Sequence, residues 1–160
     1  MYIIEPLESH DRKNFDCGEE IFNRYLRERA AQDIRRKLNR VFVLREENSE
    51  KIFGYYTLAA TTIEARKLSA DRAKHLPAYP LPAALLGKLA VDKARQGRGI
   101  GKLLLANAVR RVQRLEKEMG IHVLVVDPFV DRLAKFYVSV GFRQFLPERR
   151  LFLFMDNLEK

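Results

Sequence analysis

The chain has 160 residues, 47% of them hydrophobic and 32% charged, which suits one globular domain over residues 1–160 and excludes a disordered protein. No apolar run reaches the roughly 20 residues that a membrane span needs, and the single cysteine, Cys17, excludes an internal disulfide and a cysteine-based zinc site. The 30 lysine and arginine residues outnumber the 21 aspartate and glutamate residues, and the net charge of +9 indicates an anionic partner or a solvated basic surface.

The N-terminal half predicts a strand, a helix and a hairpin, in that order. The helix is expected to begin near Asp16, because an aspartate followed three residues later by Glu19 resembles a capping box. Apolar residues then recur at helical spacing as far as about Lys37. The expected strands are residues 2–7, 41–44 and 52–60, the last two joined by a polar turn at 47–50.

The C-terminal half alternates strands with helices after a proline-punctuated connection between Thr62 and Pro82. The strongest expected helix runs from Gly99 to Met119, and Gly120 follows it as a helix-stop residue. The other expected elements are strands at 83–91, 122–126, 143–146 and 150–155 and a helix at 131–140 ended by Gly141. Hairpins followed by alternating strands and helices indicate an α/β (α+β) protein with a mixed sheet and helices on both faces.

The most informative segment is the glycine-rich turn that follows the strand ending at Val91. Its three glycines alternate with other residues, at Gly97, Gly99 and Gly101, immediately before the long helix. Glycines let backbone N–H groups point into one concavity, and the first-turn amides of a helix favour a phosphate. Arg95, Arg98 and Lys102 are expected to add positive charge there, so the turn predicts a phosphate site.

Two other phosphate-binding motifs do not fit this turn. In a Walker loop, serine or threonine follows the lysine, whereas Leu103 follows Lys102 here. A dinucleotide fingerprint needs a third glycine at the position of Lys102. A glycine-rich turn on its own could also simply begin a helix.

Two motifs together resemble the GNAT acetyltransferase superfamily. Gln96-x-x-Gly99-x-Gly101 looks like its acetyl-CoA signature, and Ala134-Lys135-Phe136-Tyr137-Val138-Ser139-Val140-Gly141-Phe142 resembles its second signature, A-x-x-F-Y-x-x-x-G-F. Their order and distance match, and the resemblance spans nearly the whole chain. It implies a single GNAT domain with a mixed, mostly antiparallel sheet, and acetyl-CoA as the acetyl donor with no metal.

The resemblance also implies specific site residues. A splayed strand would leave the backbone amides of Leu89, Ala90 and Val91 free to hold the cofactor and its thioester. The pyrophosphate would be held by the amides of Gln96, Gly97, Arg98, Gly99, Ile100, Gly101 and Lys102. Tyr137 matches the family tyrosine that protonates the departing thiolate, and a phenol of reference pKa about 10 stays protonated at neutral pH.

No general base stands out from the sequence. Asp92 and Glu64 could serve, although solvated carboxylates are the commoner interpretation, and Cys17 lacks a paired histidine. An acceptor α-amine, with a reference pKa of about 7.7–8.0, barely needs a base, whereas a lysine near 10.4 does. The histidines are scattered, without a partner at useful spacing: His10, His75 and His122.

The N-terminal third is similar to the GNAT toxins of bacterial type II toxin–antitoxin pairs. His10-Asp11-Arg12-Lys13-Asn14-Phe15-Asp16-Cys17-Gly18 and Gly54-Tyr55-Tyr56-Thr57-Leu58 follow that family's H-D-x-x-x-F-x-C-G and G-Y-Y-T-L patterns. The resemblance implies a cytoplasmic homodimer that acetylates the α-amine of aminoacyl-tRNA and is neutralised by a ribbon-helix-helix antitoxin. Basic residues that could meet tRNA phosphates are Arg24, Arg27, Arg35, Arg36, Lys37, Arg40, Arg110, Arg111, Arg114, Arg149 and Arg150.

Two alternatives fit the same sequence. The chain could be an ordinary GNAT enzyme that acetylates a protein N-terminus, a lysine or a small amine. It could also be a catalytically silent protein that binds CoA or associates with DNA.

Overall fold

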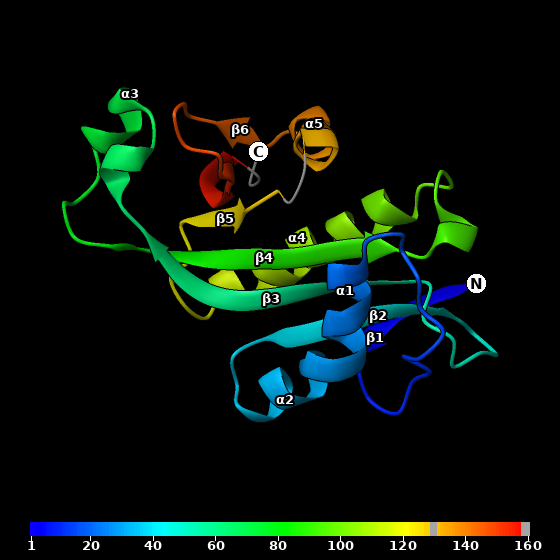
Figure 1. The fold of residues 1–160 in the computed structure, drawn as a ribbon. Helices are drawn as coiled ribbons and strands as arrows, with labels where there is room; N and C mark the ends of the chain where they lie inside the picture. The colour runs from blue at the N-terminus through cyan, green and yellow to red at the C-terminus, as the bar shows by residue number, and fades with distance from the viewer. Residues whose placement is uncertain (129–130, 158–160) are drawn as a thin grey trace. The chain divides into compact units, whose positions relative to one another are not determined.

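The structure is a computed structural model that describes residues 1–128 and 131–157. Hydrogen bonding joins the described strands in the order β1-β2-β3-β4-β5-β7-β6 (Figure 1). The strands are β1 (Tyr2–Pro6), β2 (Arg40–Glu46), β3 (Gly54–Ile63), β4 (Leu81–Val91), β5 (Val123–Val126), β6 (Arg143–Gln144) and β7 (Leu151–Phe154). The α-helices are α1 (Glu20–Arg24), α2 (Ala30–Arg35), α3 (Ala70–Ala73), α4 (Ile100–Glu116) and α5 (Asp131–Ser139).

The sheet is mixed and mostly antiparallel, as the sequence predicted. β1 with β2, β2 with β3, β5 with β7 and β6 with β7 pair antiparallel, whereas β4 and β5 run parallel. The chain divides into two compact units, residues 1–59 with 87–110, and residues 60–86 with 111 onward. None of the helices in the described part of the chain is long and apolar enough to cross a membrane.

In the first unit, helices cover both faces of the strands. Consecutive strand residues point to opposite faces, and Tyr55 and Tyr56 of β3 are both fully buried. The Tyr55 hydroxyl donates to the Phe22 carbonyl of α1 at 2.8 Å, whereas the Tyr56 hydroxyl donates to Oδ1 of Asn107 in α4 at 2.6 Å. These two tyrosines therefore fix α1 to one face of β3 and α4 to the other.

The first helical segment differs from its sequence prediction in two ways. It begins at Glu20 rather than near Asp16, because the Asp16 carboxylate accepts the Gly18 N–H and the Asn23 side-chain amide instead of capping a helix. The segment also contains a π-helical turn (η1, Tyr25–Arg29) between α1 and α2. Such a turn adds one residue to the helical register, and π-turns are frequent at functional sites.

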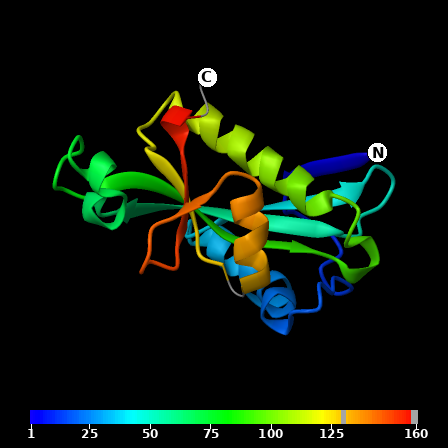
Figure 2. The same ribbon diagram turned by 90° about the horizontal axis from the view of Figure 1, so that it is seen from above.

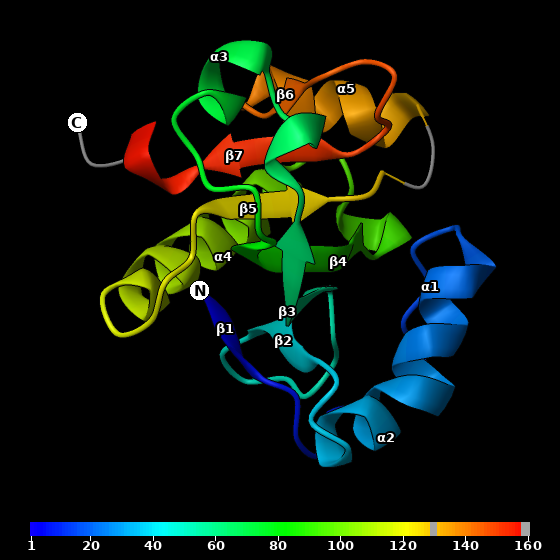
Figure 3. The same ribbon diagram turned by 90° about the vertical axis from the view of Figure 1, so that its left-hand side faces the viewer.

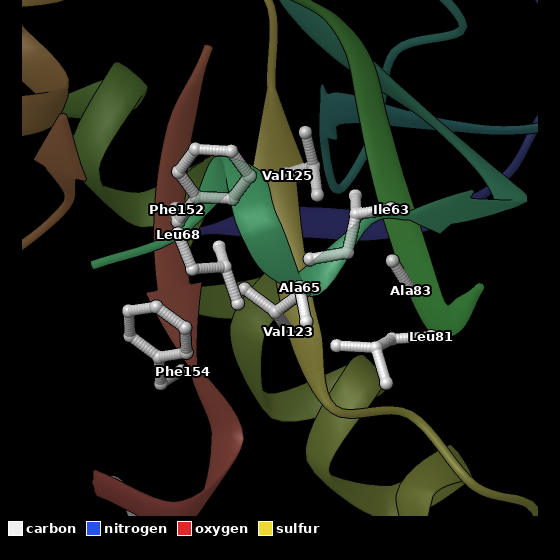
Figure 4. Close-up of a cluster of buried hydrophobic side chains, with 9 residues drawn as sticks. All are labelled: Ile63, Ala65, Leu68, Leu81, Ala83, Val123, Val125, Phe152 and Phe154. Atoms are coloured by element: carbon white, nitrogen blue, oxygen red, sulfur yellow. The ribbon is translucent and has the colours of Figure 1, made fainter. Parts of the chain in front are cut away.

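In the second unit, β5 lies between β4 and β7, with Ala83 opposite Val123 and Val123 opposite Phe154 (Figure 3). Helix α5 packs against β7. Apolar side chains from these strands and from the segment after β3 form one buried cluster (Figure 4). Its members are Ile63, Ala65, Leu68, Leu81, Ala83, Val123, Val125, Phe152 and Phe154.

Two other expectations need correction. The long helix ends at Glu116, and Gly120 is not among the glycines with positive φ, so it does not act as a left-handed helix stop. The connection between Thr62 and Pro82 is more ordered than predicted. β3 continues to Ile63, and Ser69 caps helix α3 by accepting the Arg72 N–H.

Candidate active site

The glycine-rich turn has the geometry of an open backbone cradle. After β4, a short 3-10 turn (η3, Lys93–Arg95) leads to Gly97 and Gly99, both at φ +80°, and α4 begins at Ile100 (Figure 2). A positive φ favours glycine, and a Cβ added at either position would have no described atom within 4 Å. The backbone at the start of α4 is therefore exposed to a ligand without side-chain obstruction, which suits an anion.

The side chains of Asp92 and Gln96 hold this turn in place through hydrogen bonds to the backbone. Asp92 is buried at 5% exposure, and its carboxylate accepts the N–H groups of Ala94 at 2.9 Å and Asp16 at 3.1 Å. The Gln96 side-chain amide donates to the Cys17 carbonyl at 2.8 Å and to the Val91 carbonyl at 2.9 Å. Asp92 is thus neither a solvated carboxylate nor an available base, and Gln96 uses its side chain to position the turn.

Of the three cations expected around the turn, only two have a charge that is available to a ligand. The Arg95 guanidinium pairs with Glu46 and lies 4.2 Å from the centre of the Phe53 ring, so its charge is already neutralised. Arg98 and Lys102 are exposed and form no ion pair with a described carboxylate. The positive charge available to a phosphate therefore comes from Arg98, Lys102 and the backbone amides.

The second group of expected site residues lies at the end of β4. The ladder with β5 ends where Leu86 faces Val126, yet β4 continues through Leu89, Ala90 and Val91. Leu89 and Ala90 are buried at 8% and 6% exposure. The resemblance places the cofactor-holding amides of Leu89, Ala90 and Val91 in this segment, beyond the end of the ladder with β5.

Tyr137 lies on α5 in the second unit, whereas the turn and residues 89–91 belong to the first. Its ring is buried at 3% exposure and packs edge-to-face against Phe136 and Phe142, each 5.2 Å away between ring centres. Gly141, at φ +109°, ends this helix as predicted. Burial raises the pKa of the Tyr137 phenol above its ordinary value of 10, so the hydroxyl keeps its proton at neutral pH.

Four further candidates for nucleophile or base are buried, hydrogen-bonded or ion-paired. Burial raises the pKa of the Cys17 thiol, which disfavours the reactive thiolate. His10 lies between the Glu8 N–H at 3.0 Å and the Glu5 carboxylate at 3.2 Å. Burial lowers the pKa of His122, which therefore stays neutral, and Glu64 pairs with Arg66. Among the described residues, no group of His, Cys, Asp and Glu side chains could hold a metal ion.

Sequence reasoning missed one charged residue of the first unit, Lys88. It directly precedes Leu89 on β4, is half-buried, and places its ammonium 4.1 Å from the centre of the Tyr25 ring. A single lysine in a strand carries no pattern that a sequence can reveal. Its ammonium approaches the Tyr25 ring of the π-helical turn only because the fold brings β4 and that turn together.

Comparison with known proteins identifies the family. Residues 37–144 match the family described as Acetyltransferase (GNAT) domain. The tRNA-acetylating toxin of Mycobacterium tuberculosis (strain ATCC 25618 / H37Rv) is 30% identical over 135 residues, covering 84% of this chain and 80% of that toxin. The family match over residues 37–144 includes both the glycine-rich turn and Tyr137.

Solved structures extend the similarity to nearly the whole chain. A tyrosine-to-phenylalanine mutant of KacT is 32% identical with a TM-score of 0.94, over 99% of this chain and 97% of that one. AtaT complexed with acetyl-methionyl-tRNAfMet is 32% identical with a TM-score of 0.93, over 99% and 98%. A mutant AtaT bound to acetyl-CoA and the C-terminus of the antitoxin AtaR is 31% identical with a TM-score of 0.84, over 99% and 96%. This chain is therefore an N-acetyltransferase of the GNAT superfamily and belongs to its toxin branch.

Proposed function

We propose that this chain is a toxin that transfers the acetyl group of acetyl-CoA to the α-amine of aminoacyl-tRNA and thereby blocks translation. The observation that carries this proposal is the similarity to AtaT complexed with acetyl-methionyl-tRNAfMet, at 32% identity over 99% of this chain. A relative named tRNA-acetylating toxin supports the same acceptor. An acetylated α-amine can no longer attack a peptidyl ester, so the modified tRNA cannot accept a growing chain.

Acetyl-CoA would bind through the first unit. The amides from Gln96 to Lys102 would hold the pyrophosphate at the start of α4, with Arg98 and Lys102 adding charge. The amides of Leu89, Ala90 and Val91 would hold the thioester end. A backbone N–H aimed at the thioester oxygen would stabilise the negative charge that develops there during attack.

Tyr137 would serve as the general acid. The acceptor nitrogen attacks the thioester carbon, a C–N bond forms, the C–S bond breaks, and the leaving sulfur takes the phenolic proton. The acceptor nitrogen releases its own proton to solvent, and the Tyr137 phenolate takes up one proton from solvent, so that the amide product and the enzyme are both neutral. Because burial raises the pKa of Tyr137, its proton is present throughout the physiological range.

A basic cluster at the end of α2 would meet tRNA phosphates. It consists of four exposed residues: Arg35, Arg36, Lys37 and Arg40. The backbone fixes their spacing, because Lys37 adopts φ 60° and the Leu38 N–H closes onto the Asp33 carbonyl at 2.9 Å. No member forms an ion pair with a described carboxylate. Two other basic candidates are paired, Arg27 with Glu20 and Arg150 with Asp127.

Charge reversal in this cluster tests the proposed acceptor. Arg35→Glu with Arg36→Glu should weaken aminoacyl-tRNA binding and reduce the slope of log Kd against log salt concentration by about 1 for each lost phosphate contact. Acetyl-CoA binding should stay unchanged. Lys74→Glu with Lys117→Glu, at two exposed lysines of the second unit, is the charge-matched control. Equal tRNA affinity and equal salt slopes for the double variant and the wild type would remove this cluster from the tRNA contact.

The proposal also covers domain organisation, oligomeric state, cellular location and the antitoxin partner. We propose that residues 1–160 act as one acetyltransferase domain, that the chain forms a homodimer, and that it works in the cytoplasm where charged tRNA occurs. The AtaT complex with the antitoxin AtaR supports a protein antitoxin as the regulatory partner, for which we propose the ribbon-helix-helix class.

A further inference from the structure

Lys88 belongs to a polar cluster in the first unit that is centred on Tyr25. Its ammonium lies over the face of Tyr25, and the Tyr25 hydroxyl donates to Oδ2 of Asp33 at 2.9 Å. The Asn39 side-chain amide donates to the Tyr25 hydroxyl at 3.1 Å and to Asp33 at 3.3 Å. The Asp33 oxygen that faces the cluster is therefore already engaged by two donors. The Lys88 cluster thus consists of Lys88, Tyr25, Asp33 and Asn39.

The charge of Lys88 is desolvated but not paired. No described carboxylate lies within ion-pair distance of its ammonium, which instead contacts the uncharged ring face of Tyr25. Burial lowers the pKa of Lys88, and the more distant charge of Asp33 opposes this shift. From β3, Tyr55 stacks on Tyr25, and burial raises the pKa of Tyr55 so that it stays neutral. A half-buried cation without a counterion is unfavourable for folding, which points to a functional role.

The backbone holds Lys88 in a fixed position. Its N–H donates to Oγ1 of Thr57 on β3 at 3.0 Å. The preceding residue must be small, because a Cβ at Gly87 would lie 2.8 Å from the same Thr57 oxygen. Tyr25, which receives the ammonium, opens the π-helical turn. The next residues along β4 are Leu89, Ala90 and Val91, to which the proposed function assigns the thioester.

We propose that Lys88 is a residue of the acceptor site whose ammonium lowers the pKa of the bound acceptor amine and so keeps that amine unprotonated for attack. This inference rests on the proposed function, in which residues 89–91 hold the thioester. A neighbouring like charge disfavours the protonated amine, which releases its proton to water before the C–N bond forms and the C–S bond breaks. The device replaces the general base that neither the sequence nor the described side chains supply.

The effect matches the requirement of an α-amine. With a reference pKa of about 7.7–8.0, only a minority of such amines is unprotonated at pH 7. A downward pKa shift of about one unit would raise that fraction about fivefold. A lysine side chain, near 10.4, would remain almost fully protonated after the same shift. A shift of this size is therefore sufficient for an α-amine acceptor and insufficient for a lysine acceptor.

The test is the pH dependence of kcat with saturating acetyl-CoA and aminoacyl-tRNA for the wild type, Lys88→Met and Lys88→Arg. The acidic limb of kcat reports groups in the enzyme–substrate complex, whereas the limb of kcat/KM reports free enzyme and free substrate. We expect Lys88→Met to move the kcat limb upward by about one pH unit and to leave the position of the kcat/KM limb unchanged. Lys88→Arg should restore the wild-type limb because it keeps the charge.

Thermal unfolding separates this role from a structural one. Lys88→Met removes a desolvated cation while keeping a similar chain length, so its Tm should equal or exceed that of the wild type. An unmoved kcat limb, or an equal loss of kcat at every pH with a lowered Tm, would overturn the proposal. If the wild type acetylates another amine but no aminoacyl-tRNA, the proposed function fails instead. The same pH profile on the accepted amine then decides the role of Lys88.

Discussion

Replacing Gly99 by aspartate is expected to lower the affinity for acetyl-CoA by orders of magnitude while the protein still folds. Gly99 precedes α4 with φ +80°, and a Cβ there projects into open space. Aspartate is among the residues that tolerate a positive φ, so the fold should persist. Its carboxylate would lie among the amides proposed to hold the pyrophosphate and would repel it.

Gly99→Asn is the matched control for this substitution. Asparagine has nearly the shape of aspartate and a similar tolerance for positive φ, but no charge. Calorimetry should show a smaller loss of acetyl-CoA affinity for Gly99→Asn than for Gly99→Asp. Normal binding by a folded Gly99→Asp protein would contradict the pyrophosphate assignment. Equal losses in the two variants would attribute the effect to shape rather than to charge.

Tyr137→Phe is expected to leave acetyl-CoA binding nearly unchanged and to reduce kcat by about 10²-fold or more. The substitution keeps the ring that packs against Phe136 and Phe142 and removes only the phenolic proton donor. Since burial raises the pKa of Tyr137, the wild-type kcat should show no alkaline loss from its deprotonation below about pH 10. Steady-state kinetics with saturating substrates provide the measurement.

Tyr56→Phe controls for the loss of a buried hydroxyl elsewhere. It removes the 2.6 Å hydrogen bond to Asn107 and should lower stability by about 1 kcal/mol without changing kcat. An unchanged kcat for Tyr137→Phe would return Tyr137 to a packing role on α5. A drop of similar size in both variants would indicate a general effect of lost stability.

The elements nearest to the glycine-rich turn could be predicted from sequence because their signals are local. Glycines at alternate positions, a preceding apolar strand and a following periodic helix each depend on neighbouring residues only. The structure has positive φ at Gly97 and Gly99, and α4 begins at Ile100, one residue after the predicted start. Tyr137 was singled out only through its motif, because a tyrosine on a short helix is otherwise typical of a core residue.

Side-chain partners far apart in the sequence could not be predicted in this way. Asp16 resembles a helix cap in sequence, yet its backbone N–H is bound by Asp92, 76 residues away, and its carboxylate by Asn23. Arg95 resembles a phosphate ligand, yet Glu46, 49 residues away, takes its charge. Competition between such partners depends on the assembled fold, so the local pattern gave the wrong role.

The proposed reaction is tested most directly by incubating the protein with radiolabelled acetyl-CoA and matched samples of charged and uncharged tRNA. Label should enter the charged tRNA alone, and mild alkaline hydrolysis should release it as an N-acetyl-amino acid. The reaction should weaken as salt rises, because tRNA binding depends on phosphate contacts. Labelling of peptides or polyamines, with no labelled aminoacyl-tRNA at low salt, would contradict the proposed acceptor.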